Sequence, residues 1–478
     1  MRDEKGFLEV ADRAADLLLG AGGVTVVAHI DADGVSSAAI ATASLDRAGV
    51  PNDVRFVKKI DPTEIDRINA DTADVVWLVD LGSGSFSAFT RPNMVITDHH
   101  VPDTDSPSRK GGQLDLFSFE DTHVNPHLYG IDGATEVSGS GVTYTVAKAM
   151  DPGNIDLAPV AMVGANGDFQ DSAACRMVGW NRRIIADGEA DGGLEAREDV
   201  RIYGRETRPL VQWLQFSNDP MLPGLTGNAD GCARFLRELD IELRSEERWR
   251  CYVDLEGDER AALVDGLLSH LEGRGRPTKR LTGEVYELIR ERRGTELHDA
   301  KEYSTMLNAC GRYGKAAIGM AICRGDRGDA LNEGVALQRN HRSNLANGIE
   351  MIKGQVERRR FLQFFHAGDR VQDSIVGIVA GMVLASGSVG TDLPMVAFAD
   401  SEDEAPDGST VENVKVSTRG TRDLVVRGLD LAHAVAVSSS LVGGSGGGHN
   451  IAAGATIPKG KEEEFMAMME DIIASQII

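Results

Sequence analysis

Short runs of apolar residues alternate with longer amphipathic stretches up to about residue 190 of the chain. Four of the runs are rich in β-branched side chains and have the length of a buried strand. The stretches between them are long enough for crossover helices. This alternation predicts a parallel, doubly wound α/β sheet. The expected strands are residues 24–29, 54–57, 75–79 and 94–97.

The pattern changes near residue 200, where the chain becomes more charged and takes on helical spacing. It changes again after a long candidate helix, where Val, Ala and Gly become frequent and a second, smaller α/β domain is expected. The last segment, 461–478, has the apolar spacing of a packed helix. The expected parts are an α/β domain over 1–195, a helical insertion over 196–337, a connecting helix over 338–365 and the second α/β domain over 366–478.

Length and composition narrow the class of protein. A chain of 478 residues is too long for one compact core, and its 42% of hydrophobic residues is enough for a core in each of two or three domains. This excludes disordered and fibrous classes. The longest apolar run, from Ile375 to Ala385, is shorter than the ~20 residues that a bilayer span needs, and the amino terminus is charged from its second residue. We expect a soluble cytoplasmic protein with no membrane partner.

The cysteines give no sign of a disulfide framework or a zinc module. They are odd in number, scattered, and form no CxxC pair, which is typical of a reducing cytoplasm. We expect all of them to be ordinary small core residues. They are Cys175, Cys232, Cys251, Cys310 and Cys323.

The charge is strongly acidic, with 74 Asp+Glu against 50 Lys+Arg and a net charge of -24. Arginine greatly outnumbers lysine, and the acidic residues are spread along the chain. Dispersed surface charge of this kind suits a salt-rich cytoplasm, so we expect a halophilic source. At molar salt the screening length falls to ~3 Å, so long-range repulsion is lost. Net charge therefore does not exclude a nucleic-acid substrate.

Three potential metal ligands follow the first predicted strand at alternate positions. His29, Asp31 and Asp33 lie in the sequence HIDADG, where that strand should end. Alternate residues of an extended segment share a face, and loops at the carboxyl ends of parallel strands line the ligand crevice. The spacing therefore favours three side chains aimed at one point, although a surface loop can also supply two aspartates.

Further ligand-type residues end three other segments. Asp80 follows the third predicted strand, and Asp98-His99-His100 follows the fourth. Asp168 closes the sequence GANGD, whose glycines permit close backbone approach. Each has a simpler interpretation when taken singly. Asp80 is equally typical of a helix N-cap or a turn, His99-His100 of a polar loop, and Asp168 of a turn. Four such ends in one chain favour a shared site.

The charge of the proposed cluster indicates its chemistry. Its four carboxylates would repel one another unless two divalent cations neutralised them. Carboxylates with imidazoles suit manganese or magnesium, and the histidines favour manganese; the absence of thiolates argues against structural zinc. Two ions about 3.5–4 Å apart that share one aspartate can activate a hydroxide for attack on phosphorus. The chemistry indicated is phosphoester hydrolysis. The carboxylates are Asp31, Asp33, Asp80 and Asp168.

These motifs match a known family in their order along the chain. HIDADG, Asp80, the Asp98-His99-His100 triplet and GANGD resemble the motifs of the DHH phosphoesterase superfamily. Near the carboxyl terminus, the segment Gly443 to His449 is similar to the GGGH motif of the associated DHHA1 domain. The sequence around HVNP, GIDG and SGSGV looks most like that of archaeal RecJ-type single-strand exonucleases. Members of that family degrade DNA or RNA to mononucleotides with two manganese or magnesium ions.

The resemblance implies a role for each matching residue. His29 and Asp31 would hold one ion, and Asp80 would bridge to the other. His100 would face the scissile phosphate. The active site would lie in the cleft between the two lobes. The ligands of the second ion would be Asp33, His99 and Asp168.

A substrate-binding role is expected for the glycine-rich motif and for one arginine. Consecutive glycines let backbone N–H groups approach an anion, and His449 can donate a hydrogen bond to phosphate. Arg419 is a second candidate phosphate clamp, because a guanidinium matches phosphate oxygens in a bidentate manner. A flexible turn and a surface arginine are the simpler interpretations. The glycines concerned are Gly446, Gly447 and Gly448.

We therefore expect a single-strand-specific exonuclease of DNA or RNA, acting in replication or repair. A helical insertion of more than a hundred residues favours a substrate that is a polymer. One alternative is a small-substrate phosphoesterase, acting on short oligonucleotides, cyclic dinucleotides or a phosphonucleoside. A second is a replication scaffold, since some archaeal relatives bind the GINS complex and eukaryotic relatives have lost catalysis. The intact ligand set argues against a purely structural role.

Overall fold

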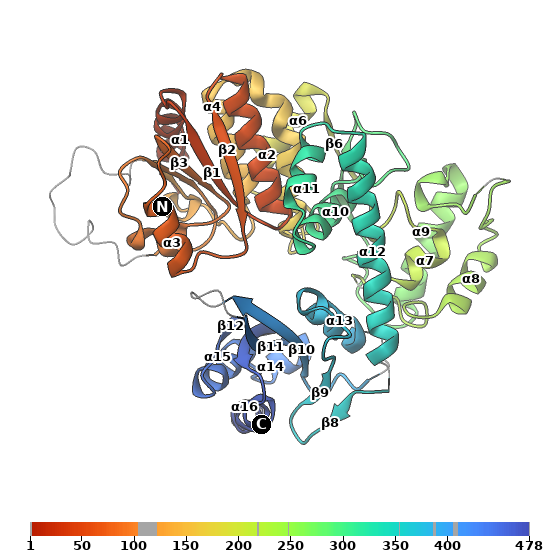
Figure 1. Cartoon of the computed structure of the whole chain (residues 1–478). Helices are drawn as coiled ribbons and strands as arrows, with labels where there is room; N and C mark the ends of the chain where they lie inside the picture. Colours follow the sequence, from red (N-terminus) through yellow and green to blue (C-terminus); the bar gives the residue numbers. More distant parts are fainter. Residues whose placement is uncertain are drawn as a thin grey trace. The chain divides into compact units, whose positions relative to one another are not determined.

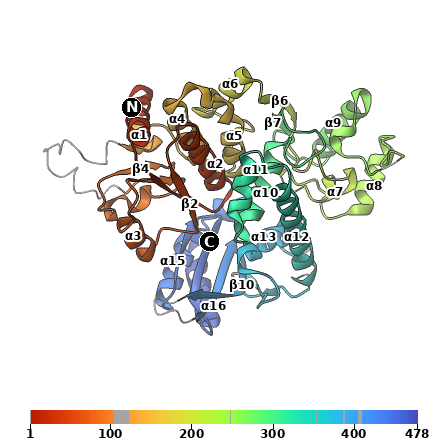
Figure 2. The same ribbon diagram turned by 45° about the horizontal axis from the view of Figure 1, so that its top comes forward.

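The computed structural model divides the chain into two compact units, residues 1–338 and 339–478. Figures 1 and 2 show both units from two directions. The structure describes residues 2–103, 122–217, 219–246, 248–352, 354–385, 389–404 and 410–477.

A five-stranded sheet forms the centre of the first unit, with the order β2-β1-β3-β4-β5. Every neighbouring pair of its strands is parallel, as expected. Three predicted strands are confirmed with their bounds, and β2 begins two residues earlier than predicted. The fifth strand has two residues, too few to give a sequence pattern. The strands are β1 (Val24–His29), β2 (Asn52–Val57), β3 (Val75–Val79), β4 (Met94–Thr97) and β5 (His123–Val124).

Both faces of this sheet are covered, which explains why its strands are apolar throughout. Val75, Trp77 and Val79 pack on one face, whereas Val76 and Leu78 belong to a separate core on the other. α1 (Glu4–Leu19), α2 (Ala32–Arg47) and α4 (Gly139–Met150) supply the first face (Figure 1). The second face packs against α3 (Pro62–Asn69) and the 3₁₀ segment η1 (Ser83–Ala88). The sheet is therefore doubly wound.

A further layer of helices lies against α2 and α4. α5 packs on both of them, and α10 packs on α2 and α5. Met306 and Leu307 of α10 are fully buried in the same core as the sheet. The members of this layer are α5 (Ala158–Gly167), α6 (Asn181–Asp191), α10 (Ala300–Arg312) and α11 (Ala316–Cys323). Two 3₁₀ turns, η4 (Pro126–Tyr129) and η5 (Pro152–Leu157), lie before and after α4.

The helical insertion has a core of its own, which includes Trp213, Leu236 and Leu267. An antiparallel pair, β6 (Leu194–Val200) and β7 (Thr282–Leu288), lies at its base (Figure 2). The expected insertion reached residue 337, but helices α10 and α11 pack on the first core instead, because their apolar sides face α2. The exact domain boundaries stay a prediction. The insertion contains α7 (Leu210–Gln215), α8 (Ala229–Glu238), η6 (Tyr252–Asp254) and α9 (Gly257–Glu272).

The predicted connecting helix exists but was wrong in its bounds. α12 runs over Asp329–Ile352, not over 338–365. Gly354 has φ +79°, a left-handed conformation that is typical of a residue just after a helix. The aromatic residues beyond it favour strands, and β8 (Glu357–Arg358) and β9 (Gln363–His366) follow.

The second unit is a six-stranded sheet with the order β12-β13-β11-β10-β9-β8. All neighbours are antiparallel except β9 and β10. α13 (Asp373–Ala385) packs on one face, and α15 (Leu431–Leu441) and α16 (Glu462–Gln476) pack on the other. This confirms a second, smaller α/β domain with a helix near its end. The other elements are β10 (Met395–Glu404), β11 (Thr410–Arg419), α14 (Arg422–Val426), β12 (Ser445–His449) and β13 (Ala452–Pro458).

Two composition-based expectations can be compared with the structure. Among the described residues, no helix is both long and apolar enough to cross a bilayer. All five cysteines are free thiols; four are buried, and Cys323 is partly exposed.

Burial in the second unit predicts a difference between two identical substitutions. Val416 is fully buried in the core beneath α15 and α16, whereas Val426 is 88% exposed. Val416→Ala should lower the free energy of unfolding by about 2–3 kcal/mol, because two methyl groups leave water-excluded packing. Val426→Ala should change it by less than about 0.5 kcal/mol. Denaturant unfolding, followed by hydrogen exchange of second-unit peptides, measures both; equal effects would contradict this packing.

Candidate metal centre

The first three predicted ligands converge through a strand-to-helix turn. His29 is the last residue of β1, Asp31 is the N-cap of α2, and Asp33 lies in the first turn of that helix. The expectation that all three alternate along an extended segment was therefore wrong. The Asp31 carboxylate accepts a hydrogen bond from the Gly34 N–H at 3.0 Å, and this cap starts the helix. A Cβ atom at Gly34 would lie 2.4 Å from the His29 carbonyl oxygen, so the turn requires glycine.

Asp80 occupies the centre of the site, directly after β3. It is 2% exposed and has φ +59°, a left-handed conformation that is uncommon outside glycine. A Cβ atom at position 139 would lie 2.5 Å from Asp80 Oδ1 and 2.9 Å from its Cα, so Gly139 makes room for this side chain. Asp80 Oδ1 is buried and has no hydrogen-bond partner. An orphaned carboxylate oxygen in a protein interior points to a missing ligand.

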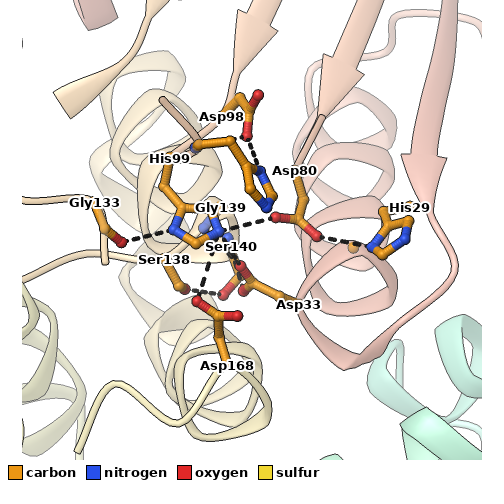
Figure 3. A network of polar contacts seen from close by, with 12 residues as sticks. His29, Asp33, Asp80, Asp98, His99, Gly133, Ser138, Gly139, Ser140 and Asp168 are labelled. Atoms are coloured by element: carbon orange, nitrogen blue, oxygen red, sulfur yellow. Dashed lines mark hydrogen bonds and ion pairs between the residues drawn. The ribbon is translucent and has the colours of Figure 1, made fainter. Parts of the chain in front are cut away.

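His99 presents one ring nitrogen to three of the carboxylates (Figure 3). Its Nδ1 lies 2.7 Å from the carbonyl oxygen of Gly133 and donates to it, which turns Nε2 toward the carboxylates. Nε2 lies 3.8 Å from Asp33 Oδ2, 3.5 Å from Asp80 Oδ1 and 3.6 Å from Asp168 Oδ2. A backbone carbonyl behind a histidine commonly orients it toward a metal ion.

Asp168 reaches the site from the carboxyl end of a helix. It is the C-cap of α5. The predicted close approach by the glycines is confirmed, because a Cβ atom at Gly164 would lie 2.5 Å from Asp33 Oδ1. The next residue, Phe169, has φ +56° and is 67% exposed. It is an exposed aromatic side chain beside the site, which sequence reasoning did not single out.

The six predicted ligand residues thus meet in one place and form two groups. His29 Nδ1 lies 3.0 Å from Asp31 Oδ2 and 3.6 Å from Asp80 Oδ2. Asp80 therefore turns one oxygen toward His29 and the other toward His99. The donor atoms within each group lie within 4.8 Å of one another, so each group could hold a metal ion. The two groups are His29, Asp31 and Asp80, and Asp33, His99 and Asp168.

The amino terminus of α4 fixes Asp33, a role that sequence reasoning missed. Asp33 accepts hydrogen bonds from the backbone N–H groups of Gly139 at 2.7 Å and Ser140 at 3.0 Å (Figure 3). A helix amino terminus carries partial positive charge, which stabilises a carboxylate there. The available signal was Ser138, whose side chain caps the helix ahead of two small residues.

Asp98 orients His100 and does not join the cluster. Its carboxylate accepts from His100 Nδ1 at 2.8 Å and from the Ser83 N–H at 2.8 Å. The His100 side chain is 59% exposed, so its Nε2 is accessible from outside. The hydrogen bond that the His100 ring donates to Asp98 raises the pKa of His100 to about 9.

The pKa values of the cluster show the cost of gathering these acids without a counter-ion. Burial, followed by the charges of Asp33 and Asp31, raises the pKa of Asp80 to about 7. Burial also raises the pKa of Asp168 to about 6. Although burial opposes it, hydrogen bonds to Asp31 and Asp80 raise the pKa of His29 to about 11. Protons thus occupy positions where cations would neutralise the same charge.

The donor set fits divalent cations. Carboxylate oxygens and imidazole nitrogens suit manganese and magnesium, and neither group contains a thiolate. The orphaned Asp80 Oδ1 lies where it could coordinate an ion. The residues present are therefore compatible with a pair of such ions.

The predicted substrate-binding residues lie together in the second unit. Arg419 and His449 both pair with Ala452 in the register of the sheet, so the three side chains form a row on one face. Arg419 is on the face covered by α13, because its guanidinium lies close to Gly377. The glycine-rich motif forms β12, an edge strand of the sheet rather than a loose turn. Two of its glycines, Gly446 and Gly448, are exposed.

Three protein-family models match the chain. They are the DHH family, N-terminal domain over residues 23–165, the DHH-CID domain over 202–285 and the DHHA1 domain over 361–475. An uncharacterized protein of Methanocaldococcus jannaschii is 27% identical over 464 residues, which cover 95% of this chain and 94% of that protein.

Solved structures with the same fold include two RecJ proteins. RecJ from Thermus thermophilus in complex with Mn²⁺ aligns with a TM-score of 0.57 at 17% identity, covering 99% of this chain and 56% of that one. Exonuclease RecJ bound to manganese aligns with a TM-score of 0.55 at 17% identity, covering 98% and 94%. This chain thus spans little more than half of the Thermus protein.

A third solved structure with the same fold is not a RecJ protein. CDC45 from Entamoeba histolytica aligns with a TM-score of 0.62 at 9% identity, covering 98% of each chain. At these identities the likeness concerns the fold alone. The chain thus matches DHH, DHH-CID and DHHA1 domain models in that order, and it shares its fold with the RecJ structures.

The Asp98–His100 pair predicts a specific titration. In the metal-free protein, His100 should titrate near pH 9, and Asp98→Asn should move its midpoint down toward the ordinary 6.5, because the carboxylate partner is lost. Histidine-selective NMR measures both midpoints. An unchanged midpoint in the variant would show that Asp98 does not hold the imidazolium.

The same pair has a defined effect on stability. The pKa of His100 is higher in the folded protein than in the unfolded chain, so its protonation stabilises the folded state. This contribution is fully present below about pH 6.5 and is lost as the pH rises through about 9. The stability difference between the native protein and Asp98→Asn should therefore shrink over that interval. A residual difference should remain, because Asp98 also accepts the Ser83 N–H.

Proposed function

We propose that this protein is a single-strand-specific exonuclease that hydrolyses phosphodiester bonds of DNA or RNA and releases nucleoside monophosphates in replication or repair. The observation that carries the proposal is the meeting of six carboxylate and imidazole side chains around the buried Asp80. Manganese is the favoured cation and magnesium the other candidate, since two histidines join the carboxylates.

Each of two cations would have its own ligands. His29 and Asp31 would hold one ion, and Asp80 would bridge to the second. The geometry supports this division, because the two oxygens of Asp80 face different histidines. When bound, such a pair supplies the charge that activates a water and stabilises the leaving oxygen. The second ion would be held by Asp33, His99 and Asp168.

His100 would bind the scissile phosphate. Asp98 accepts from its Nδ1 and raises its pKa to about 9, so the ring is protonated at neutral pH. Its Nε2–H is then free to donate to a phosphate oxygen, where negative charge builds up as water attacks phosphorus. Because Asp98 is itself held by the Ser83 N–H, the donor is positioned before substrate arrives.

The second unit would hold the phosphates of the strand. Arg419 and His449 lie in one row across three strands and present a guanidinium and an imidazole to the same face. Bidentate donation from arginine fits phosphate, and the glycine edge strand leaves its backbone accessible. The exposed Phe169 beside Asp168 could stack on a base, which is a sequence-tolerant contact. The glycines involved are Gly446, Gly447 and Gly448.

Two other functions have some support. A small-substrate phosphoesterase would use the same metal centre, and digestion of long strands against dinucleotides distinguishes it. A replication scaffold, for example one that binds the GINS complex, is favoured by the fold likeness to CDC45. The complete ligand set favours catalysis, although binding and catalysis are compatible.

The bridging role of Asp80 predicts the effect of its removal. Asp80→Ala should reduce manganese-dependent degradation of a single strand by a factor of roughly 10³ or more, because both ions lose a shared ligand. The fold should persist, since one self-repelling acid is removed from the interior. Release of mononucleotides from end-labelled strands, with manganese and with a chelator, measures activity.

Asp53→Ala is the matched control, because Asp53 is an exposed aspartate on β2 of the same sheet. It should retain native activity. An Asp80→Ala protein that still degrades strands in manganese would refute the bridging assignment. Activity confined to dinucleotides in the native protein would instead favour the small-substrate alternative.

A further inference from the structure

A second cluster of potential metal ligands lies at the base of the helical insertion. Glu206 is in the loop between β6 and α7, Glu287 is in β7, and His298 lies between β7 and α10. Their exposed fractions are 0%, 5% and 4%. One donor atom from each lies within 4.8 Å of the others. The cluster shares no residue with the centre around Asp80.

The orientation of His298 suits coordination. Its Nδ1 lies 3.0 Å from the carbonyl oxygen of Glu291 and donates to it. This leaves Nε2 turned toward the cluster, 3.7 Å from Glu287 Oε2. A histidine whose second nitrogen donates to a backbone carbonyl is the usual arrangement of a metal ligand. His99 is held by a backbone carbonyl in the same way.

Glu206 supplies an independent sign of a missing ligand. Its Oε2 accepts a hydrogen bond from the Gly294 N–H at 2.6 Å, whereas its Oε1 is buried and has no hydrogen-bond partner. A buried carboxylate oxygen without a partner costs free energy that a bound cation would recover. Burial raises the pKa of Glu206.

Nearby arginines leave one side of the cluster open. Arg205 contacts Glu287 Oε1 at 3.0 Å, but it also contacts Asp199 at 2.9 Å and Asp299 at 3.2 Å. Arg197 also donates to Glu287 Oε1, at 2.5 Å. Glu287 Oε2 faces His298 instead of an arginine. The arginines therefore hold Glu287 through its Oε1, and its Oε2 is left for the side of the cluster that His298 lines.

We propose that Glu206, Glu287 and His298 form a third metal site, which takes one divalent transition-metal ion, with zinc as the best-matched cation. Two carboxylates and one imidazole, with a water molecule as fourth ligand, suit a four-coordinate zinc ion. Such sites bind zinc more tightly than manganese. The site joins the chain that enters the insertion to the strand that leaves it. A metal link that closes so long a loop stabilises the junction.

Metal analysis of zinc-loaded, dialysed protein tests the proposal. Glu206→Gln should carry one zinc ion fewer per chain than the native protein. Glu291→Gln is the matched control, because the Glu291 carboxylate pairs with Arg327 and lies outside the cluster. It should retain the native count. Zinc should also raise the melting temperature of Glu206→Gln by less than that of the native protein and the control. Equal zinc content in all three would overturn the proposal.

A measurement on the native chain covers the case in which Glu206→Gln fails to fold. Anomalous scattering from zinc-soaked crystals should give a peak about 2.0–2.2 Å from donor atoms of all three residues. No peak there would mean that His298 and the glutamates share a proton instead, and the proposal would fail. Asp80→Ala should keep this peak, so failure of the third site and failure of the proposed nuclease centre are distinguishable.

Discussion

The mutual repulsion of four aspartates around one small volume is the constraint on which the site depends. Asp80 is at its centre, is almost fully buried, and has one carboxylate oxygen without a hydrogen-bond partner. The raised pKa values of Asp80 and Asp168 measure the penalty for holding these charges together. A protein gains nothing in stability from such an arrangement. It is explained if cations complete it, since two divalent ions would cancel the four charges.

The surrounding backbone is built to permit this crowding. Gly139 leaves room for Asp80, Gly164 leaves room for Asp33, and Gly34 allows the turn that starts α2. The parallel sheet brings His29, Asp80 and His99 to one edge, because the carboxyl ends of its strands meet there. Helices α2, α4 and α5 then supply the remaining ligands and the N–H groups that hold them. Fold and site are therefore linked through a few positions where only glycine fits.

The sequence predicted the strands and the identity of the six ligands. It predicted less well which helices and turns bring these side chains to the site. Strand ends could be located because buried parallel strands are continuous apolar runs. The sequence did not show that Asp33 and Asp168 lie on helices, since a few polar residues after a strand have no distinct periodicity. Asp98 was known only as part of a motif, and its contact with Ser83 depends on tertiary packing. The helix α12 ends earlier than predicted for a local reason, because Gly354 just after it is left-handed.

The central claim is that Asp80 lies between two metal ions. Crystals of the whole chain soaked in manganese and measured near the manganese absorption edge test it most directly. The account predicts two anomalous peaks about 3.5–4 Å apart, one beside His29 and Asp31 and the other beside His99 and Asp168, with a carboxylate oxygen of Asp80 on each. A single peak, or two peaks that Asp80 does not contact, would contradict it.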